Sequence, residues 1–221
     1  MTERLTGVRQ GYDRWAVSYD DADASTVLDE PAVRELAGPL AGQRALDVAC
    51  GTGRFARLLA EAGAKVVGVD LSIAMLRRAM RDGSPASWVQ GSVERLPIAD
   101  AAVAGVTCGL VIDHLPEPGV IFGEIARVLR PGGVMLLSAV HPELQQFRGE
   151  RVRFETERER LAMPGHIHQP GKVRAAIEGA GLAVTRVAEP RVDESLVERD
   201  PAWRPRLGLR ALLVIEAQKP A

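Results

Sequence analysis

Short apolar runs rich in β-branched residues alternate along the chain with stretches in which apolar residues recur at helical spacing. Runs of the first kind predict buried strands, and recurrence every three or four residues predicts amphipathic helices. The predicted helices cover residues 55–62, 73–80, 121–129 and 173–180. The predicted strands cover residues 44–49, 65–69, 87–89, 103–110, 134–140, 182–188 and 209–217.

This alternation favours an α/β fold with parallel strands, right-handed connections and helices on both faces of one sheet. Gly63 is placed to end the first helix, and Ser72 to cap the start of the second. Residues 189–208 contain three prolines and no helical period. We therefore expect the last strand to run antiparallel to the others, at one edge of the sheet.

Two segments lie outside the alternation. Residues 141–169 include a charge-dense run, 148–160, which we expect to form a solvated strand or helix face beside a substrate pocket. The other segment is N-terminal, and we expect it to form a helix that packs on the sheet edge. Large side chains recur on one face of that helix: Val8, Tyr12, Trp15 and Tyr19.

Composition narrows the class of protein. The 221 residues suit a single domain, and 28 Lys and Arg against 29 Asp and Glu lack the basic excess of a nucleic-acid-binding protein. The longest weakly polar run, residues 101–112, is far shorter than the roughly 20 residues that span a bilayer. Cys50 and Cys108 lie in apolar runs, as reduced thiols do. We therefore expect a cytoplasmic protein whose partners are neither nucleic acid nor membrane.

The strongest chemical signal is a predicted strand that runs through Gly51 and Gly53 directly into a helix. Glycine lets a ligand approach the backbone there, and the free amides of the helix suit a polar or anionic group. Asp47 lies inside this strand, and Asp70 ends the next one, where a carboxylate can take both hydroxyls of a ribose. Alternatively, Asp47 satisfies backbone amides and Asp70 caps the following helix.

Several motifs together resemble the class I S-adenosylmethionine-dependent methyltransferases, in their small-molecule branch. They are 11–20, 46–53, 66–72 with Met75, 90–97 and 129–133. The resemblance implies a Rossmann-like, seven-stranded, mostly parallel sheet with an antiparallel last strand, helices on both faces and an N-terminal helical lid. It implies one domain over residues 1–221, divided into lid helices (1–40), a cofactor-binding core (41–140), a substrate lid (141–169) and the rest of the sheet (170–221).

The resemblance also implies contacts with the methionine part of S-adenosylmethionine. Gly51 and Gly53 would pass against it, together with Ala49, and Asp47 would orient its ammonium group. Tyr19 would close over the sulfonium from the N-terminal helix.

For the adenosine part, the resemblance implies that Asp70 holds the ribose. Leu71 and Met75 would flank the adenine, while Ser92 and Val93 would meet its edge.

At the end of the fourth strand, Gly109 and Leu110 would face the methionine group.

The sequence departs from the family pattern at three points. Ser92 replaces an aspartate that accepts from the adenine amino group, and a neutral hydroxyl accepts more weakly. Ala49 stands where a glycine is common, and Val103 with Ala104 replaces a Phe-Asp pair.

A methyl acceptor needs a base only if it must lose a proton during the reaction. His141 ends the fifth strand and His114 follows the fourth, and such strand ends face the ligand crevice of an α/β sheet. His141 is the preferred base and His114 the second candidate. A metal site made of His141, His166 and His168 is conceivable, but the spacing of these residues is loose and no cysteines support it. No metal is therefore predicted.

The predicted function is methyl transfer to oxygen, nitrogen or carbon of a small, partly apolar metabolite, such as a secondary metabolite, by a monomer or homodimer. A nicotinamide-dependent oxidoreductase is the first alternative, weakened by Ala56 at the third glycine position and by Asp47, which would repel a pyrophosphate. A nucleic-acid methyltransferase lacks support because residues 109–114 carry no Asn/Asp-Pro-Pro-aromatic motif. A non-catalytic protein that binds S-adenosylmethionine stays open.

Overall fold

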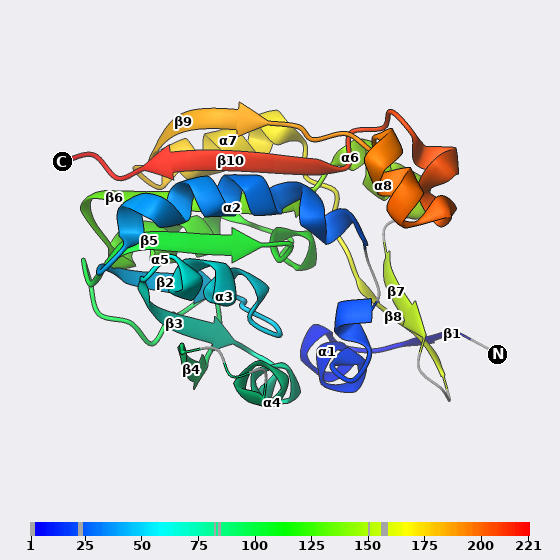
Figure 1. Cartoon of the computed structure of the whole chain (residues 1–221), viewed down its shortest axis with the longest axis horizontal. Helices are drawn as coiled ribbons and strands as arrows, with labels where there is room; N and C mark the ends of the chain where they lie inside the picture. The colour runs from blue at the N-terminus through cyan, green and yellow to red at the C-terminus, as the bar shows by residue number, and fades with distance from the viewer. Residues whose placement is uncertain (1–2, 22–23, 82, 84, 150, 156–158) are drawn as a thin grey trace.

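A computed structural model describes residues 3–21, 24–81, 83, 85–149, 151–155 and 159–221. A seven-stranded sheet with strand order β4-β3-β2-β5-β6-β10-β9 forms its centre (Figure 1). All predicted strands are present, so the Rossmann-like α/β prediction is confirmed. The strands are β2 (Arg44–Val48), β3 (Lys65–Asp70), β4 (Ser87–Gln90), β5 (Val103–Gly109), β6 (Leu129–Val140), β9 (Ala183–Ala188) and β10 (Leu212–Gln218).

Helices cover both faces of this sheet, because each presents an apolar stripe to it. On one face, α2 (Glu30–Ala37) and α3 (Arg54–Glu61) bury side chains such as Val33 and Leu59. On the other, α5 (Gly119–Val128) and α7 (Pro170–Gly179) bury side chains such as Phe122 and Ile177. The helix α4 (Ile73–Arg81) lies beside β3 and β4.

The last strand is antiparallel, as predicted, but it does not form an edge. β10 pairs with β6 on one side and with β9 on the other, both antiparallel, so β9 is the edge strand. The burial of the two strands gives the reason. Nearly every residue of β10 is buried, including Leu212 and Ile215, whereas most residues of β9 are exposed. An apolar strand gains more from having a neighbour on each side.

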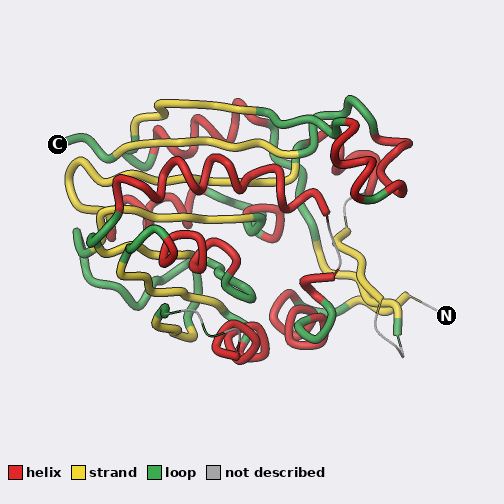
Figure 2. Tube along the Cα trace, viewed as in Figure 1, coloured by secondary structure: helices red, strands yellow, loops and turns green. Residues whose placement is uncertain are grey.

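A second, smaller sheet combines the two segments that lay outside the strand–helix alternation. Its order is β1-β8-β7, formed by β1 (Glu3–Leu5), β8 (Arg160–Pro164) and β7 (Arg151–Glu155). The helix α1 (Val8–Trp15) packs on it, with the ring of Trp15 stacked on Phe154 at 4.7 Å between centroids. Figure 2 draws the strands of both sheets in yellow, and the small sheet lies apart from the central one. We call α1 and this small sheet the lid.

The predicted N-terminal helix is shorter than its aromatic stripe. α1 ends at Trp15, and Tyr19 begins a separate 3-10 turn (Tyr19–Asp21). The remaining short elements are connections. They are the 3-10 turns Ala24–Asp29, Gly38–Leu40, Ile112–His114 and Pro201–Arg206, and the helices α6 (Pro142–Arg148) and α8 (Glu194–Arg199).

The segment before β10, in which we predicted no helix, contains α8. Asp193 caps it by accepting a hydrogen bond from the amide of Leu196 at 2.9 Å. A single capped turn is too short to display a helical period. Cys50 and Cys108 are free and buried, as expected for reduced thiols. In the described part of the chain, none of the helices has the length and apolarity to cross a bilayer.

Candidate functional site

Two cavities with shared walls lie at the carboxyl ends of the parallel strands. The lid lies at the same end of the sheet (Figure 1). The smaller cavity has a volume of about 270 Å³ and the larger one about 430 Å³. Ligand pockets of proteins typically measure roughly 300–1,000 Å³. The cavities share part of their walls: Tyr12, Tyr19, Ala49, Gly51, Gly109, Leu110 and His114.

The turn after β2 adopts a backbone shape that favours glycine. Gly51 has φ +54° and Gly53 has φ +87°, and the amide of Gly53 donates to the carbonyl of Cys50 at 2.8 Å. No heavy atom lies within 4 Å of the position that a Cβ atom would take at Gly51. The main chain at this residue is therefore directly accessible from the two cavities that it lines. Ala49 and Leu110 also have positive φ, 54° and 53°. Strained non-glycine residues of this kind concentrate at ligand sites.

Asp70 lines the smaller cavity at the end of β3. Its Oδ2 accepts a hydrogen bond from the amide of Gly51 at 2.8 Å, and its Oδ1 accepts one from the amide of Ser72 at 2.7 Å. Burial raises the pKa of this carboxyl, and the two amides oppose that effect. Each carboxylate oxygen can accept a second hydrogen bond, so Asp70 orders the glycine turn and can still bind a ligand diol.

Asp47 lines the larger cavity from inside β2. Its Oδ2 accepts from the amide of Ala56 at 3.0 Å, and its Oδ1 accepts from the hydroxyl of Thr107 at 2.9 Å. Burial raises the pKa of Asp47 to about 7, more than these hydrogen bonds lower it. The backbone role that we considered for Asp47 is therefore present, and the carboxyl also faces the cavity.

The lid is fastened to the same turns that build the cavities. Asp13 Oδ1 accepts from the hydroxyl of Ser72 at 2.6 Å. In the 3-10 turn that follows α1, Asp20 Oδ1 accepts from the hydroxyl of Thr52 at 2.6 Å, and its Oδ2 lies 3.4 Å from a guanidinium nitrogen of Arg78. Both contacts end beside cavity residues, so opening the lid must disturb the turns after β2 and β3.

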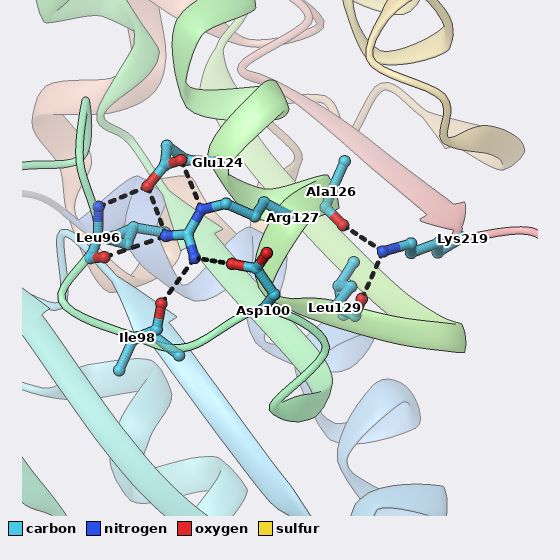
Figure 3. A network of polar contacts seen from close by, with 8 residues as sticks. All are labelled: Leu96, Ile98, Asp100, Glu124, Ala126, Arg127, Leu129 and Lys219. Carbon is cyan, nitrogen blue, oxygen red and sulfur yellow. Dashed lines mark hydrogen bonds and ion pairs between the residues drawn. The ribbon is translucent and has the colours of Figure 1, made fainter.

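The loop after β4 is fixed from behind by α5 (Figure 3). Arg127 donates to the carbonyls of Leu96 and Ile98 at 3.1 and 2.8 Å, and it also binds Glu124 and Asp100. Nearby, Lys219 donates to the carbonyls of Ala126 and Leu129, at the end of α5. This network anchors the loop whose first residues, Ser92 and Val93, line the smaller cavity.

Most predicted cofactor residues line one cavity or both. Gly53 and Met75 do not appear in either wall. Gly53 instead packs against Trp88, so a Cβ there would lie 2.5 Å from the indole ring. Met75 is buried in α4, and its amide donates to the hydroxyl of Ser72, which caps the helix as predicted. The remaining ten are Tyr19, Asp47, Ala49, Gly51, Asp70, Leu71, Ser92, Val93, Gly109 and Leu110.

Known proteins share this architecture. A family model described as a methyltransferase domain matches residues 46–137. A ubiquinone biosynthesis O-methyltransferase from Bordetella bronchiseptica is 30% identical over 163 residues, which cover 69% of this chain and 67% of that protein. The chain belongs to the S-adenosylmethionine-dependent methyltransferases.

Other members of this methyltransferase family match over less of their length. A demethylmenaquinone methyltransferase from Renibacterium salmoninarum is 35% identical over 117 residues, 52% of this chain and 49% of that protein. The chain thus spans about half to two thirds of these relatives. An S-adenosylmethionine-dependent methyltransferase structure from Mesorhizobium loti has a TM-score of 0.71 at 22% identity, covering 90% of this chain and 99% of that one. That likeness concerns the fold.

The methyltransferase chain brings only one of the two predicted bases into the cavities. His114 lines both, whereas His141 lines neither. The Nδ1 of His141 accepts from the amide of Glu143 at 3.2 Å, which caps α6, and its Nε2 faces Glu189 at 3.4 Å. Burial and the guanidinium of Arg210 lower its pKa. The side chain of His141 therefore caps α6 and lies outside both cavity walls, although its strand ends at the crevice, and its role as the base stays a prediction.

His166 and His168 also fail to reach the cavities of this methyltransferase. The Nε2 of His168 lies 2.9 Å from the carbonyl of Leu115 and 3.1 Å from that of Ile112, so it donates to them. Over the described residues, no three His, Cys, Asp or Glu side chains gather as metal ligands.

A buried ion pair shapes the wall of the larger cavity. Arg54 donates to both oxygens of Asp29, at 2.6 and 3.1 Å, and Asp29 also accepts from the hydroxyl of Ser138 at 2.7 Å. Asp29 is fully buried, and Arg54 lies 4.3 Å above the ring of Phe55. This pair joins the start of α2 to α3 and β6, and no pattern along the chain indicated it.

Sequence reasoning treated Tyr12 as a packing residue. The structure places its hydroxyl 2.7 Å from Nε2 of His114, where both side chains line the two cavities of the methyltransferase. The helical spacing placed Tyr12 on the inward face of α1, but nothing in the sequence indicated which residue it would meet.

Proposed function

We propose that this chain transfers the methyl group of S-adenosylmethionine to a small-molecule acceptor. The observation that carries the proposal is the pair of joined cavities at the strand ends, with Asp70 in one and the Tyr12–His114 contact at their junction. The curated relatives act, by name, on ubiquinone and menaquinone precursors. We assign the acceptor of this chain to small molecules rather than nucleic acid on that likeness.

The smaller cavity fits the adenosine part of the cofactor. The Asp70 carboxylate can accept from two ribose hydroxyls, and Leu71 and Val93 supply apolar walls for the adenine. Because Gly51 has no side chain, the methionine part of the cofactor can lie against the main chain there and extend toward Asp47. When bound, S-adenosylmethionine supplies an electrophilic methyl carbon; the protein supplies alignment and exclusion of water.

We place the acceptor in the larger cavity. Trp15 and Val152 of the lid, together with Phe55 and Val140 of the core, give it apolar walls. The lid covers part of this space, which limits the access of water and favours displacement at the methyl carbon over hydrolysis. We expect a monomer or homodimer working in the cytoplasm, where the buried thiols of Cys50 and Cys108 stay reduced.

Two measurements test this function. Calorimetry should give a dissociation constant for S-adenosylhomocysteine and no heat with a nicotinamide cofactor. A screen of phenols, carboxylic acids and amines with S-adenosylmethionine should then give one product class heavier by a methyl group. Binding of a nicotinamide cofactor in place of the adenosyl ligand would favour an oxidoreductase. Adenosyl binding with no methylated product would favour the non-catalytic alternative.

Cofactor binding should release protons near neutral pH. With a pKa of about 7, the carboxyl of Asp47 is mostly protonated at pH 6 and mostly ionised at pH 8. The ammonium group of the ligand favours the ionised form, so binding expels the proton and affinity rises as pH increases through 7. We expect release of about half a proton at pH 7.

The measurement is calorimetry with S-adenosylhomocysteine in phosphate and in Tris, whose ionisation enthalpies differ. The apparent enthalpy should depend on the buffer at pH 7. Asp47→Asn should abolish that dependence. Buffer-independent heats in the unmodified protein would show that the ammonium does not lie beside Asp47.

A further inference from the structure

The Tyr12–His114 contact belongs to a chain of hydrogen bonds that fixes the protonation of the imidazole. Nδ1 of His114 lies 3.2 Å from the carbonyl oxygen of Pro164, and a carbonyl can only accept. Nδ1 therefore carries the hydrogen, and Nε2 holds a lone pair. The Tyr12 hydroxyl, 2.7 Å away, donates to that lone pair.

This arrangement leaves no ring nitrogen of His114 open to an acceptor. One is bound to Pro164 of the lid sheet, and the other to Tyr12 of the lid helix. Both partners belong to the lid, whereas His114 follows β5 of the core. A proton from the larger cavity can reach the imidazole only through the Tyr12 oxygen, which has lone pairs of its own.

We propose that Tyr12 is a catalytic residue that relays the acceptor's proton to His114, and that the acceptor is a phenol-type hydroxyl. The proposal rests on the proposed function and names its substrate class. It also gives the lid a role in the reaction, since the lid holds Tyr12 against the imidazole of His114.

Proton transfer through Tyr12 accompanies the transfer of the methyl group. The acceptor oxygen bonds to the methyl carbon while the sulfur–carbon bond breaks, and that electron pair stays on sulfur. The acceptor's O–H proton moves to the Tyr12 oxygen, and the Tyr12 proton moves to Nε2 of His114. The positive charge of the sulfonium thus ends on the imidazolium, which later returns its proton to solvent.

Acidity separates the acceptor classes. Burial lowers the pKa of His114 below its ordinary 6.5. A phenol, with a pKa of about 10, faces a proton-transfer equilibrium uphill by at least three powers of ten. An aliphatic hydroxyl, about as weak an acid as water at roughly 15.7, faces at least nine. A carboxylic acid is ionised at neutral pH and needs no relay.

The groups that face this relay do not replace it. Burial raises the pKa of Tyr12 well above its ordinary value, and Tyr19, Asp70 and Asp113 add to that effect. Tyr12 therefore stays protonated and passes a proton on rather than holding a charge. The neighbouring imidazole of His166 also opposes positive charge on His114 and lowers its pKa, after burial and against the contact with Pro164.

Tyr12→Phe tests the relay, with catechol as the phenol probe and phenylacetate as the carboxylate probe. Transfer to catechol should fall at least tenfold more than transfer to phenylacetate, since water replacing the hydroxyl relays a phenol's proton less well and a carboxylate needs no relay. Phe154→Leu is the matched control, because it loosens the same lid outside the cavity walls and should affect both probes by one factor. An unchanged catechol rate in Tyr12→Phe would overturn the proposal.

Nitrogen NMR of the histidines gives a readout that needs no turnover. In the unliganded protein, His114 should show a protonated Nδ1 and a bare Nε2, and Tyr12→Phe should shift the Nε2 resonance. A protonated Nε2 in the unmodified protein would overturn the relay. Failure of S-adenosylhomocysteine to bind would count against the proposed function instead, so the two failures are distinguishable.

Discussion

Replacing Asp29 with alanine should lower the free energy of unfolding by about 3 kcal/mol. The carboxylate is fully buried and accepts three hydrogen bonds, two from Arg54 and one from Ser138. Its removal leaves the guanidinium without its main counter-charge. Breaking a buried ion pair by removing one partner costs roughly 3–5 kcal/mol. Because the Arg54 side chain is 26% exposed, water can partly solvate it, which favours the lower end of that range.

Urea unfolding measures this loss. Glu35→Ala is the control, since it removes a carboxylate that lies 2.6 Å from Arg186 on the surface. That pair is exposed and screened, so the midpoint should not change measurably. If Asp29→Ala unfolds at the same urea concentration as Glu35→Ala, the buried pair contributes no net stability.

Replacing Asp70 with alanine should weaken binding of S-adenosylhomocysteine by about 1.5–3 kcal/mol, or roughly 10- to 150-fold. Two effects add. The ribose hydroxyls lose a charged acceptor, and the amide of Gly51 loses the carboxylate that holds the glycine turn in place. The dissociation constant from calorimetry is the measurement.

Two variants make this result specific. Asp70→Asn keeps one side-chain oxygen and should fall between the parent and Asp70→Ala. Glu178→Ala removes an exposed carboxylate that binds Arg174 on α7, outside both cavity walls, and should leave the constant unchanged. An unaltered dissociation constant in Asp70→Ala would show that the ribose lies elsewhere.

The inner strands of the central sheet were predictable because most of their residues are buried on both faces. Such strands appear in the sequence as continuous apolar runs, and their helices as stripes ended by residues such as Gly63. The lid sheet was not predictable, since β1 has three residues and β7 exposes most of its side chains. Lone short strands carry no period; their pairing comes from contacts between segments far apart in the chain.

The same contrast applies to the site. Residues in the turns after strands, such as Gly51 and Asp70, line the cavities as predicted, because their positions depend on the local backbone. Which of His114 and His141 would lie at the cavities was not predictable, because it depends on where each side chain points. Tyr12 was missed as a chemical group because its partner lies 102 residues away. Spacing along a sequence indicates a shared helix face, not what lies opposite it.

The pairing of β1 with β8 has a consequence for how the protein is made. Glu3 of β1 lies opposite Arg160 of β8, so β1 cannot pair until the residues between them have been synthesised. At roughly 5–20 residues per second, that wait is on the order of ten seconds. The aromatic rings of Tyr12 and Trp15 stay uncovered meanwhile. Newly made copies should therefore hold an open crevice until β1 pairs with β8.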